Sequence, residues 1–409
     1  MDQLRLITCG SVDDGKSTLL GRLLYDTKSI FEDQLEAVQR ASEQRGDPQL
    51  NLALLTDGLR AEREQGITID VAYRYFATPR RKFILADCPG HFEFTRNMVT
   101  GASNAQLALI LVDVRNGLTD QTRRHAFLTT LLRIRHLVVC VNKMDLVGYS
   151  QEAYERVCEQ FREYAERLES PDIQFVPISA LRGDNVVEKS PHLSWYAGTP
   201  LLYLLENVYI RNEANFIDAR FPVQAVMPGT GAGVRLAGQV ASGIFRPGDE
   251  LVHLPGGRTA RVTGIHGPAG PLPQAHHPMS VVLELDQALP AVRGDMLARR
   301  GNSPSSAREL DVMLCWLSEQ PCQADRSYVL RHTTAETACL LGTVRYRINI
   351  STLHRESNPP PLGMNDLARV TLHAAAPLFI DSYKKNRMTG SLILVDSETH
   401  ATVAAGMIL

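Results

Sequence analysis

Short runs of apolar residues, each followed by polar residues or glycine, mark the first half of the chain. Four of these runs lie at 4–9, 83–86, 137–141 and 175–178, and apolar residues at helical spacing occupy 18–24 and 154–168. Short apolar runs bounded by turn residues predict buried strands, whereas the 3.6-residue period predicts helices. Their alternation predicts a doubly wound, mostly parallel α/β sheet with its ligand at the carboxyl ends of the strands.

After a helix-like apolar run at 201–205, the pattern changes to short β-rich runs separated by glycine and proline. The first group lies at 221–226, 233–240 and 250–254, with a tight turn at 243–249. These spacings predict a small β-barrel. A polar linker at 301–306 precedes a second β-rich group at 309–317, 343–350 and 391–395. We therefore predict domains at 1–210, 211–302 and 303–409.

A glycine-rich segment joins the first predicted strand to the first predicted helix. It reads Gly10-Ser11-Val12-Asp13-Asp14-Gly15-Lys16-Ser17-Thr18, which fits the P-loop pattern. Backbone N–H groups at the helix N-terminus present partial positive charge to a phosphate. Lys16 is expected to reach the β- and γ-phosphates, and Ser17 to offer its hydroxyl to Mg²⁺. A glycine turn before an ordinary helix is the alternative interpretation.

Three later strand ends carry the other groups that a GTP site needs. Asp87 follows the strand at 83–86, where it is expected to hold Mg²⁺, and the N–H of Gly90 is expected to contact the γ-phosphate. The strand at 137–141 ends in Asn142-Lys143-Met144-Asp145, and the strand at 175–178 ends in Ser179-Ala180-Leu181. The Asp145 carboxylate can accept both guanine N1–H and N2–H, a paired donor edge that adenine lacks. Asn142, Lys143 and the 179–181 backbone complete the predicted guanine pocket.

Two further residues are predicted to act with Lys16 in hydrolysis. Thr68, in the segment 62–69, is expected to close over Mg²⁺ and the γ-phosphate in the GTP state and to let go afterwards. His91 follows Gly90 directly, where many GTPases place the residue that positions the attacking water. A lone histidine is more often a surface or satisfied loop residue, but the segment before His91 favours the catalytic interpretation.

These motifs resemble those of the translational GTPases built like elongation factor Tu, and more closely those of the GTPase subunits of bacterial sulfate adenylyltransferases. The second resemblance rests on Ser11, where the elongation factors carry histidine, and on Asp14. It extends over 57–65, 70–76, 95–98 and 120–125, and continues more weakly to residue 409. The one small departure is Cys88, where threonine is more usual.

The resemblance implies two barrels beside the GTPase domain, GTP and Mg²⁺ as ligands, and a heteromeric enzyme of sulfate activation. In that family a smaller subunit catalyses attack of sulfate on the α-phosphorus of ATP, giving adenosine 5′-phosphosulfate and pyrophosphate. GTP hydrolysis would drive this unfavourable step, and segments 57–70 and 90–104 together with a barrel face would contact the smaller subunit. A translational GTPase that delivers RNA to the ribosome and a GTP-dependent regulator are the alternatives.

Composition narrows the remaining possibilities. The net charge is −2, with 43 basic and 45 acidic residues, so nucleic acid is not the expected partner. A compact basic cluster, 384–387, is interpreted as a solvated hairpin tip, with a partner contact as the alternative. Seven cysteines without a C-x-x-C pair, no signal peptide and no membrane-length apolar run predict a reduced cytoplasmic protein. No second P-loop follows the last barrel, so phosphosulfate kinase activity is not expected.

Overall fold

The computed structural model of the protein describes residues 2–30, 32–45, 50–55, 71–89, 95–168, 172–210, 215–229, 233–323, 325–350 and 352–409. The chain divides into two compact units. The first comprises Met1–Arg211 and Ile350–Leu353, and the second Asn212–Asn349 and His354–Leu409. Among the helices in the described ranges, none has the length and apolar character that crossing a bilayer requires.

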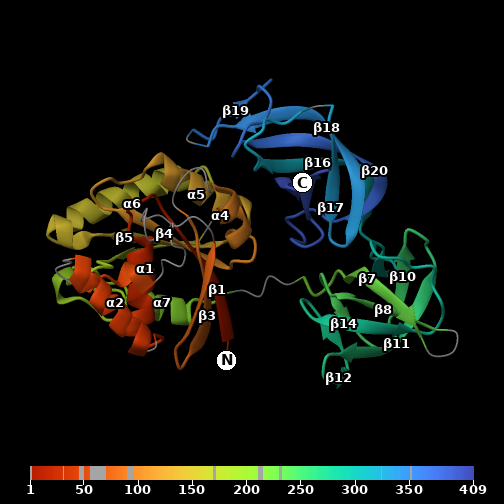
Figure 1. Cartoon of the computed structure of the whole chain (residues 1–409), viewed down its shortest axis with the longest axis horizontal. Helices are drawn as coiled ribbons and strands as arrows, with labels where there is room; N and C mark the ends of the chain where they lie inside the picture. Colours follow the sequence, from red (N-terminus) through yellow and green to blue (C-terminus); the bar gives the residue numbers. More distant parts are fainter. Residues whose placement is uncertain are drawn as a thin grey trace. The chain divides into compact units, whose positions relative to one another are not determined.

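The first unit is built on a six-stranded sheet in the order β2-β3-β1-β4-β5-β6 (Figure 1). The strands are β1 (Asp2–Cys9), β2 (Ala72–Ala77), β3 (Arg81–Asp87), β4 (Leu107–Asp113), β5 (His136–Asn142) and β6 (Asp172–Pro177). The edge strand β2 pairs antiparallel with β3, and the other pairings are parallel. Every residue of β4 is buried, as expected for a central parallel strand covered on both faces.

Helices cover both faces of this sheet. They are α1 (Lys16–Asp26), α2 (Glu32–Arg45), α4 (Thr95–Ala102), α5 (Asp120–Leu131), α6 (Gln151–Ala165) and α7 (Leu201–Asn207), with short 3-10 helices η1 (Leu52–Leu55), η3 (Met144–Val147) and η4 (Pro191–Leu193). Figure 1 shows α1 and α7 on one side of the sheet and α4, α5 and α6 on the other. The alternation predicted from the sequence is therefore confirmed.

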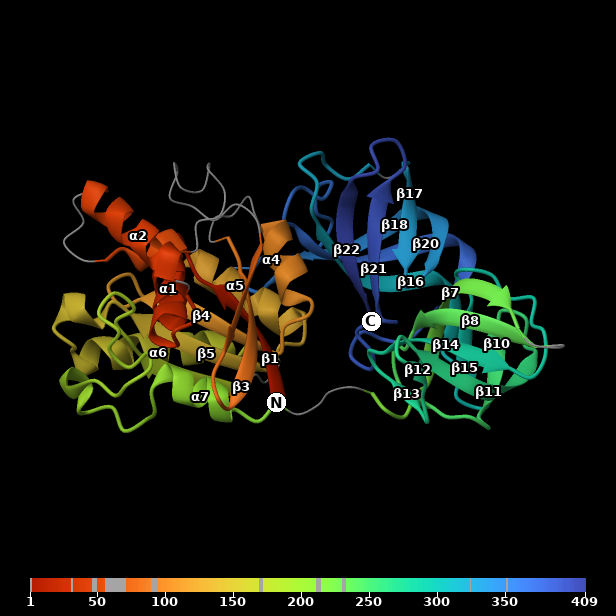
Figure 2. The same cartoon turned by 60° about the horizontal axis from the view of Figure 1, so that its bottom comes forward.

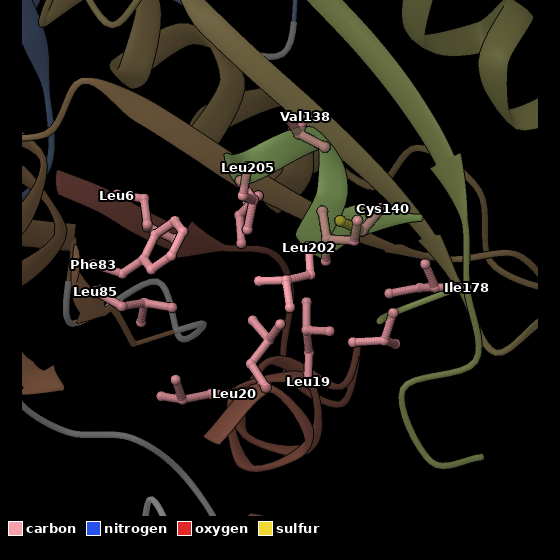
Figure 3. Packing of buried hydrophobic residues seen from close by; sticks show 14 of the residues in the cluster. Leu6, Leu19, Leu20, Phe83, Leu85, Val138, Cys140, Ile178, Leu202 and Leu205 are labelled. Atoms are coloured by element: carbon pink, nitrogen blue, oxygen red, sulfur yellow. The ribbon is translucent and has the colours of Figure 1, made fainter. Parts of the chain in front are cut away.

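The core between the sheet, α1 and α7 sets the position of the P-loop. Leu19 and Leu20 of α1 and Leu205 of α7 pack against strand residues such as Phe83 and Cys140 (Figure 3). Each fully buried leucine contributes roughly 1.5–3 kcal/mol through removal of apolar surface from water. This packing holds the N-terminus of α1 at the carboxyl end of β1, where the glycine-rich loop lies.

The second unit contains two β-barrels (Figure 2). Elements of the first are β7 (Arg220–Pro228), β8 (Val234–Gln239), β9 (Ile244–Phe245), β10 (Glu250–Leu254), β11 (Thr259–Gly267), β12 (Gly270–Pro271), β13 (Ala275–His276), β14 (Ser280–Leu285) and β15 (Met296–Arg299). Six of these strands form the ring β10-β15-β7-β8-β14-β11, which a β10–β11 pairing closes. Closure leaves the ring without unpaired edges.

The second barrel closes in the same way. Its strands are β16 (Ser305–Trp316), β17 (Ser327–His332), β18 (Ala335–Ile348), β19 (Arg355–Glu356), β20 (Leu367–Ile380), β21 (Ser391–Asp396) and β22 (Thr402–Ile408). The ring β17-β21-β22-β16-β20-β18 is completed by the β17–β18 pairing. The predicted fold class, an α/β GTPase-like domain followed by two small barrels, is confirmed. The domain limits 1–210, 211–302 and 303–409 stay a prediction, and β16 begins inside the predicted linker.

A buried polar cluster joins the two barrels within the second unit. The fully buried Arg220 guanidinium donates to the Asp381 carboxylate over 2.9 and 3.1 Å. Lys385 Nζ lies 3.2 Å from Asp218, and the Asn386 amide donates to Ser242 Oγ over 2.8 Å. Lys384 and Lys385 are exposed and Asn386 is buried, so the segment 384–387 is solvated only in part. The sequence could not reveal this, because the partners lie in the other barrel.

Candidate functional site

The glycine-rich loop occupies the turn between β1 and α1, and two of its glycines are required there. Gly10 has φ +148° and Gly15 has φ +94°, backbone conformations that side chains with a Cβ rarely adopt. A Cβ on Gly10 would lie 2.8 Å from the Leu111 carbonyl oxygen, and one on Gly15 would collide with the Asn142 amide. The loop therefore fits closely against β4 and β5, whereas the Val12 side chain is exposed.

Side chains of the loop fold back on its own backbone. The buried Asp14 carboxylate accepts a 2.6 Å hydrogen bond from the Ser11 N–H, and burial raises its pKa. Lys16, also buried, donates through Nζ to the carbonyl oxygens of Gly10 over 3.1 Å and Ser11 over 2.7 Å. Burial lowers the pKa of Lys16, while the Asp87 and Asp14 carboxylates act in the opposite direction. The ammonium is thus held inside the loop by groups that favour its charged form.

Asp87, at the end of β3, lies beside the P-loop strand. Its side chain is buried, and its Oδ1 accepts a 2.7 Å hydrogen bond from Thr8 Oγ1 of β1. Ser17 lies in the first turn of α1, which begins at Lys16. A carboxylate and a hydroxyl are the oxygen donors that Mg²⁺ prefers, so Asp87 and Ser17 fit this ion. Their role in holding it is a proposal.

The predicted guanine-binding segments meet beside the P-loop. Asn142, at the end of β5, donates through Nδ2 to the Asp14 carbonyl oxygen over 2.8 Å. Its Oδ1 accepts from the Ala180 N–H over 2.9 Å. One amide side chain therefore connects the P-loop, the 142–145 loop and the 179–181 loop. This arrangement follows from the parallel sheet, because the carboxyl ends of neighbouring strands lie at one edge.

A cation that the sequence analysis did not assign lies beside the proposed base-reading residue. Arg182 Nε is 3.7 Å from the Asp145 carboxylate, whose side chain is 6% exposed. The Arg182 backbone N–H donates to Ser179 Oγ over 3.2 Å. Arg182 directly follows the predicted segment Ser179-Ala180-Leu181, so its position in the chain was the available signal.

Side chains of helix α5 and of its N-cap contact the P-loop. The sequence analysis did not predict this support. The fully buried His125 accepts a 3.0 Å hydrogen bond at Nδ1 from the Gly10 N–H. Its Nε2 then carries the proton in the neutral ring and lies 3.0 Å from the Gln121 amide nitrogen, so the oxygen and nitrogen of that amide must exchange places for Gln121 to accept this proton. Ser11 Oγ also lies 2.6 Å from Oγ1 of Thr119, the N-cap of α5. The segment 120–125 entered the sequence analysis through the family resemblance alone.

His125 gives a testable dependence of stability on pH. Burial, with repulsion from Lys16 and Arg124, lowers the pKa of His125 to about 3, against about 6.5 for an unfolded histidine. Between these values the unfolded chain binds one more proton at this site, so lowering the pH destabilises the fold by about 1.4 kcal/mol per pH unit. Urea unfolding at pH 7, 6 and 5 should show this slope reduced in His125→Asn. Parallel pH profiles for the two chains would contradict a buried neutral histidine.

The structure brings together the described residues predicted for the phosphate, metal and base positions. Three predicted residues, Thr68, Gly90 and His91, lie outside the described residues, and their roles stay predictions. The other predicted positions occupy one edge of the sheet, at the carboxyl ends of β1, β3, β5 and β6. The geometry offers a loop for a polyphosphate, two oxygen donors for a metal ion and a carboxylate for a purine edge.

Comparisons with known proteins agree with this geometry. Residues 1–219 match the family described as the elongation factor Tu GTP binding domain, and residues 309–409 match the GTP-eEF1A C-terminal domain-like family. Among solved structures, the Ski7 GTPase-like domain of S. cerevisiae, bound to GDP and inorganic phosphate, is similar with a TM-score of 0.53. It is 17% identical and is covered over 97% of its length by all of this chain, so it shows the fold alone.

Curated relatives are much closer in sequence. The bifunctional enzyme CysN/CysC of Mycobacterium tuberculosis is 53% identical over 99% of this chain, which spans 67% of that protein. Sulfate adenylyltransferase subunit 1 of Bacteroides thetaiotaomicron is 47% identical over 100% of this chain, which spans 86% of that protein. The fold and the matched domain define a GTP-binding protein of the elongation factor Tu class. Within that class, the chain belongs to the sulfate adenylyltransferase subunit 1 family.

Proposed function

We propose that this chain hydrolyses GTP at the P-loop site and that this hydrolysis drives synthesis of adenosine 5′-phosphosulfate from ATP and sulfate by a smaller partner subunit. The observation that carries the proposal is the likeness to sulfate adenylyltransferase subunit 1 along the entire chain, together with the GTP-binding domain. The name of that relative, subunit 1, supports an assembly with a second chain. All seven cysteines are buried free thiols, which suits a reducing cytoplasm.

Different described residues would bind the phosphates, the base and the metal ion of GTP. Backbone N–H groups of the P-loop and of the first turn of α1 would contact the β- and γ-phosphates. Lys16 would then exchange its carbonyl partners, Gly10 and Ser11, for phosphate oxygens. Asp145 would accept the two N–H groups of the guanine edge. Mg²⁺, held by Ser17 and Asp87, would neutralise charge on the phosphates.

Hydrolysis can drive the partner's reaction only through a difference in free energy between two states of this chain. The GTP and GDP states must bind the partner, or its reacting complex, with unequal affinity. We place this difference in segments 57–70 and 90–104, which contain Thr68 and His91. Of these, α4 (Thr95–Ala102) lies in the described residues and packs against β1 and β3. Movement of α4 would therefore reach the strands that carry the P-loop and Asp87.

The test is GTP hydrolysis by the purified chain, alone and with the smaller sulfate adenylyltransferase subunit, with and without ATP and sulfate. We expect strong stimulation by the partner and formation of phosphosulfate in step with GTP hydrolysis. If the rate of GTP hydrolysis is the same with and without the partner and sulfate, the chain is still a GTPase, but its role in sulfate activation is overturned. A tRNA-binding assay on the same sample would then test the translational alternative.

A further inference from the structure

A buried ion cluster lies directly behind the proposed guanine-binding loop, and its central residue has no assigned role. Asp113 is the last residue of β4 and pairs in register with Asn142, the last residue of β5. The Asp113 side chain is 1% exposed. Its Oδ2 lies 3.0 Å from Lys143 Nζ, in the loop that Asn142 begins.

Arg115 completes the surroundings of this carboxylate. Arg115 donates to Asp113 from Nε over 3.0 Å and from a terminal nitrogen over 2.7 Å, and its backbone N–H donates over a further 3.0 Å. Burial alone would raise the pKa of the Asp113 carboxyl, but the hydrogen bonds from Arg115 and Lys143 outweigh it and lower the pKa to about 2. Asp113 is therefore a fixed negative charge at working pH.

Lys143 is held in a backbone conformation that needs support. Its φ is +64° and its ψ is +33°, in the left-handed region that a residue with a long side chain rarely adopts. It immediately precedes η3, whose second residue is Asp145. The backbone conformation of Lys143 thus sets how the chain turns between Asn142 and Asp145. Asn142 contacts the P-loop, and Asp145 is proposed to recognise guanine.

Three of the four residues of this loop are fixed by partners outside it. Asn142 contacts the P-loop and Ala180, Lys143 contacts Asp113, and Asp145 lies beside Arg182. The Asp113 contact is the link in this series that comes from the neighbouring strand β4. Without the carboxylate, the Arg115 and Lys143 cations would lie close together with no anion between them, and their repulsion would push the loop outward.

We propose that Asp113 is a positioning residue for the nucleotide: by holding Lys143, it keeps the guanine-binding loop in its binding conformation before GTP arrives. This inference rests on the proposed function, since it assumes that the 142–145 loop binds guanine. Because the loop contacts the base and the P-loop holds the phosphates, the effect falls equally on GTP and GDP. Asp113 does not act on the hydrolytic step.

The test is the affinity of the full chain for fluorescently labelled GTP and GDP, with kcat measured at saturating GTP. Asp113→Asn should raise Kd for both nucleotides by about tenfold, as expected when one charge-assisted hydrogen bond is lost, and should leave kcat within about twofold. Asp311→Asn is the matched control, since Asp311 lies between Arg369 and Arg345 in the second barrel. This control should bind both nucleotides as the unaltered chain does.

A double-mutant cycle separates positioning from a general loss of stability. If Asp113 acts through Lys143, the combined Asp113→Asn, Lys143→Met chain should bind nucleotide as Lys143→Met alone does, within about twofold. Fully additive losses would overturn the inference, as would an Asp113→Asn chain with unaltered Kd.

Two further results distinguish failure of this inference from failure of the proposed function. Lys143→Met, which leaves Asp113 and Arg115 paired, should itself raise both Kd values about tenfold if one held contact is lost. Unaltered affinity of that variant would overturn the inference even if Asp113→Asn failed to fold. Failure of the unaltered chain to bind guanine nucleotides would instead refute the proposed function.

Discussion

Replacing Lys16 with alanine is expected to lower GTP turnover by about 10²–10³-fold, the usual cost of removing one preorganised group that stabilises transition-state charge. Lys16 Nζ lies inside the P-loop, 2.7 Å from the Ser11 carbonyl oxygen, and is the cation proposed to reach the β- and γ-phosphates. The measurement is single-turnover hydrolysis together with Kd for GTP and GDP. GTP should lose more affinity than GDP, because GDP lacks the γ-phosphate.

Folding should change little in this variant. Burial already penalises the Lys16 ammonium, so its removal relieves a desolvation cost while depriving Asp14 and Asp87 of a nearby positive charge. Lys16→Met, which keeps the length of the side chain without its charge, is the matched control and should match the alanine variant in turnover. Normal turnover in Lys16→Met would show that the charge does not act on the phosphates. A collapse of the urea midpoint would instead make Lys16 structural.

Replacing Asp145 with asparagine is expected to shift base preference from guanine toward xanthine. The carboxylate accepts two N–H groups, whereas an amide presents one donor that matches the carbonyl oxygen at position 2 of xanthine. Sites built to hydrogen-bond a substrate group discriminate strongly, so the preference for GTP over xanthosine triphosphate should fall by about 10³-fold. Displacement of labelled GDP by each triphosphate measures it.

Arg182→Met serves as the control for this change. It removes the cation 3.7 Å from the Asp145 carboxylate and leaves that carboxylate in place. Guanine preference should therefore persist in Arg182→Met while overall affinity changes modestly. Unchanged preference for GTP in Asp145→Asn would assign base recognition to another residue and would remove the chemical basis for predicting GTP at this site.

The sequence predicted those parts of the site whose residues are adjacent in the chain. The P-loop lies between a strand and a helix in direct succession. Asp87 and Asn142 end short apolar strands, and Ser179 follows another. Because parallel strands place their carboxyl ends at one edge, predicting the sheet was enough to predict that these segments meet. The proximity of Asn142 to Asp14 and Ala180 confirms that they meet.

The residues that support these loops from elsewhere in the chain could not be predicted from the sequence. His125 holds Gly10 from 115 positions away in the chain, and Asp113 reaches Lys143 from a neighbouring strand. Neither residue has a spacing or a neighbouring motif that reports its partner. Their contacts depend on strand register and on the packing of α5 beneath the P-loop, which are tertiary properties.

By itself, therefore, the sequence determined the class of fold, the order of its domains and the chemistry of the loops at the strand ends. These follow from hydrophobic period and from residues adjacent in the chain. Only the tertiary structure decided which buried charges hold those loops, including Asp113 at Lys143 and Arg220 at Asp381 between the barrels. An unpaired buried charge costs free energy, so each buried charged residue needs a partner of opposite charge nearby. The strand or helix that packs beside it supplies that partner, and only the tertiary structure sets which element that is.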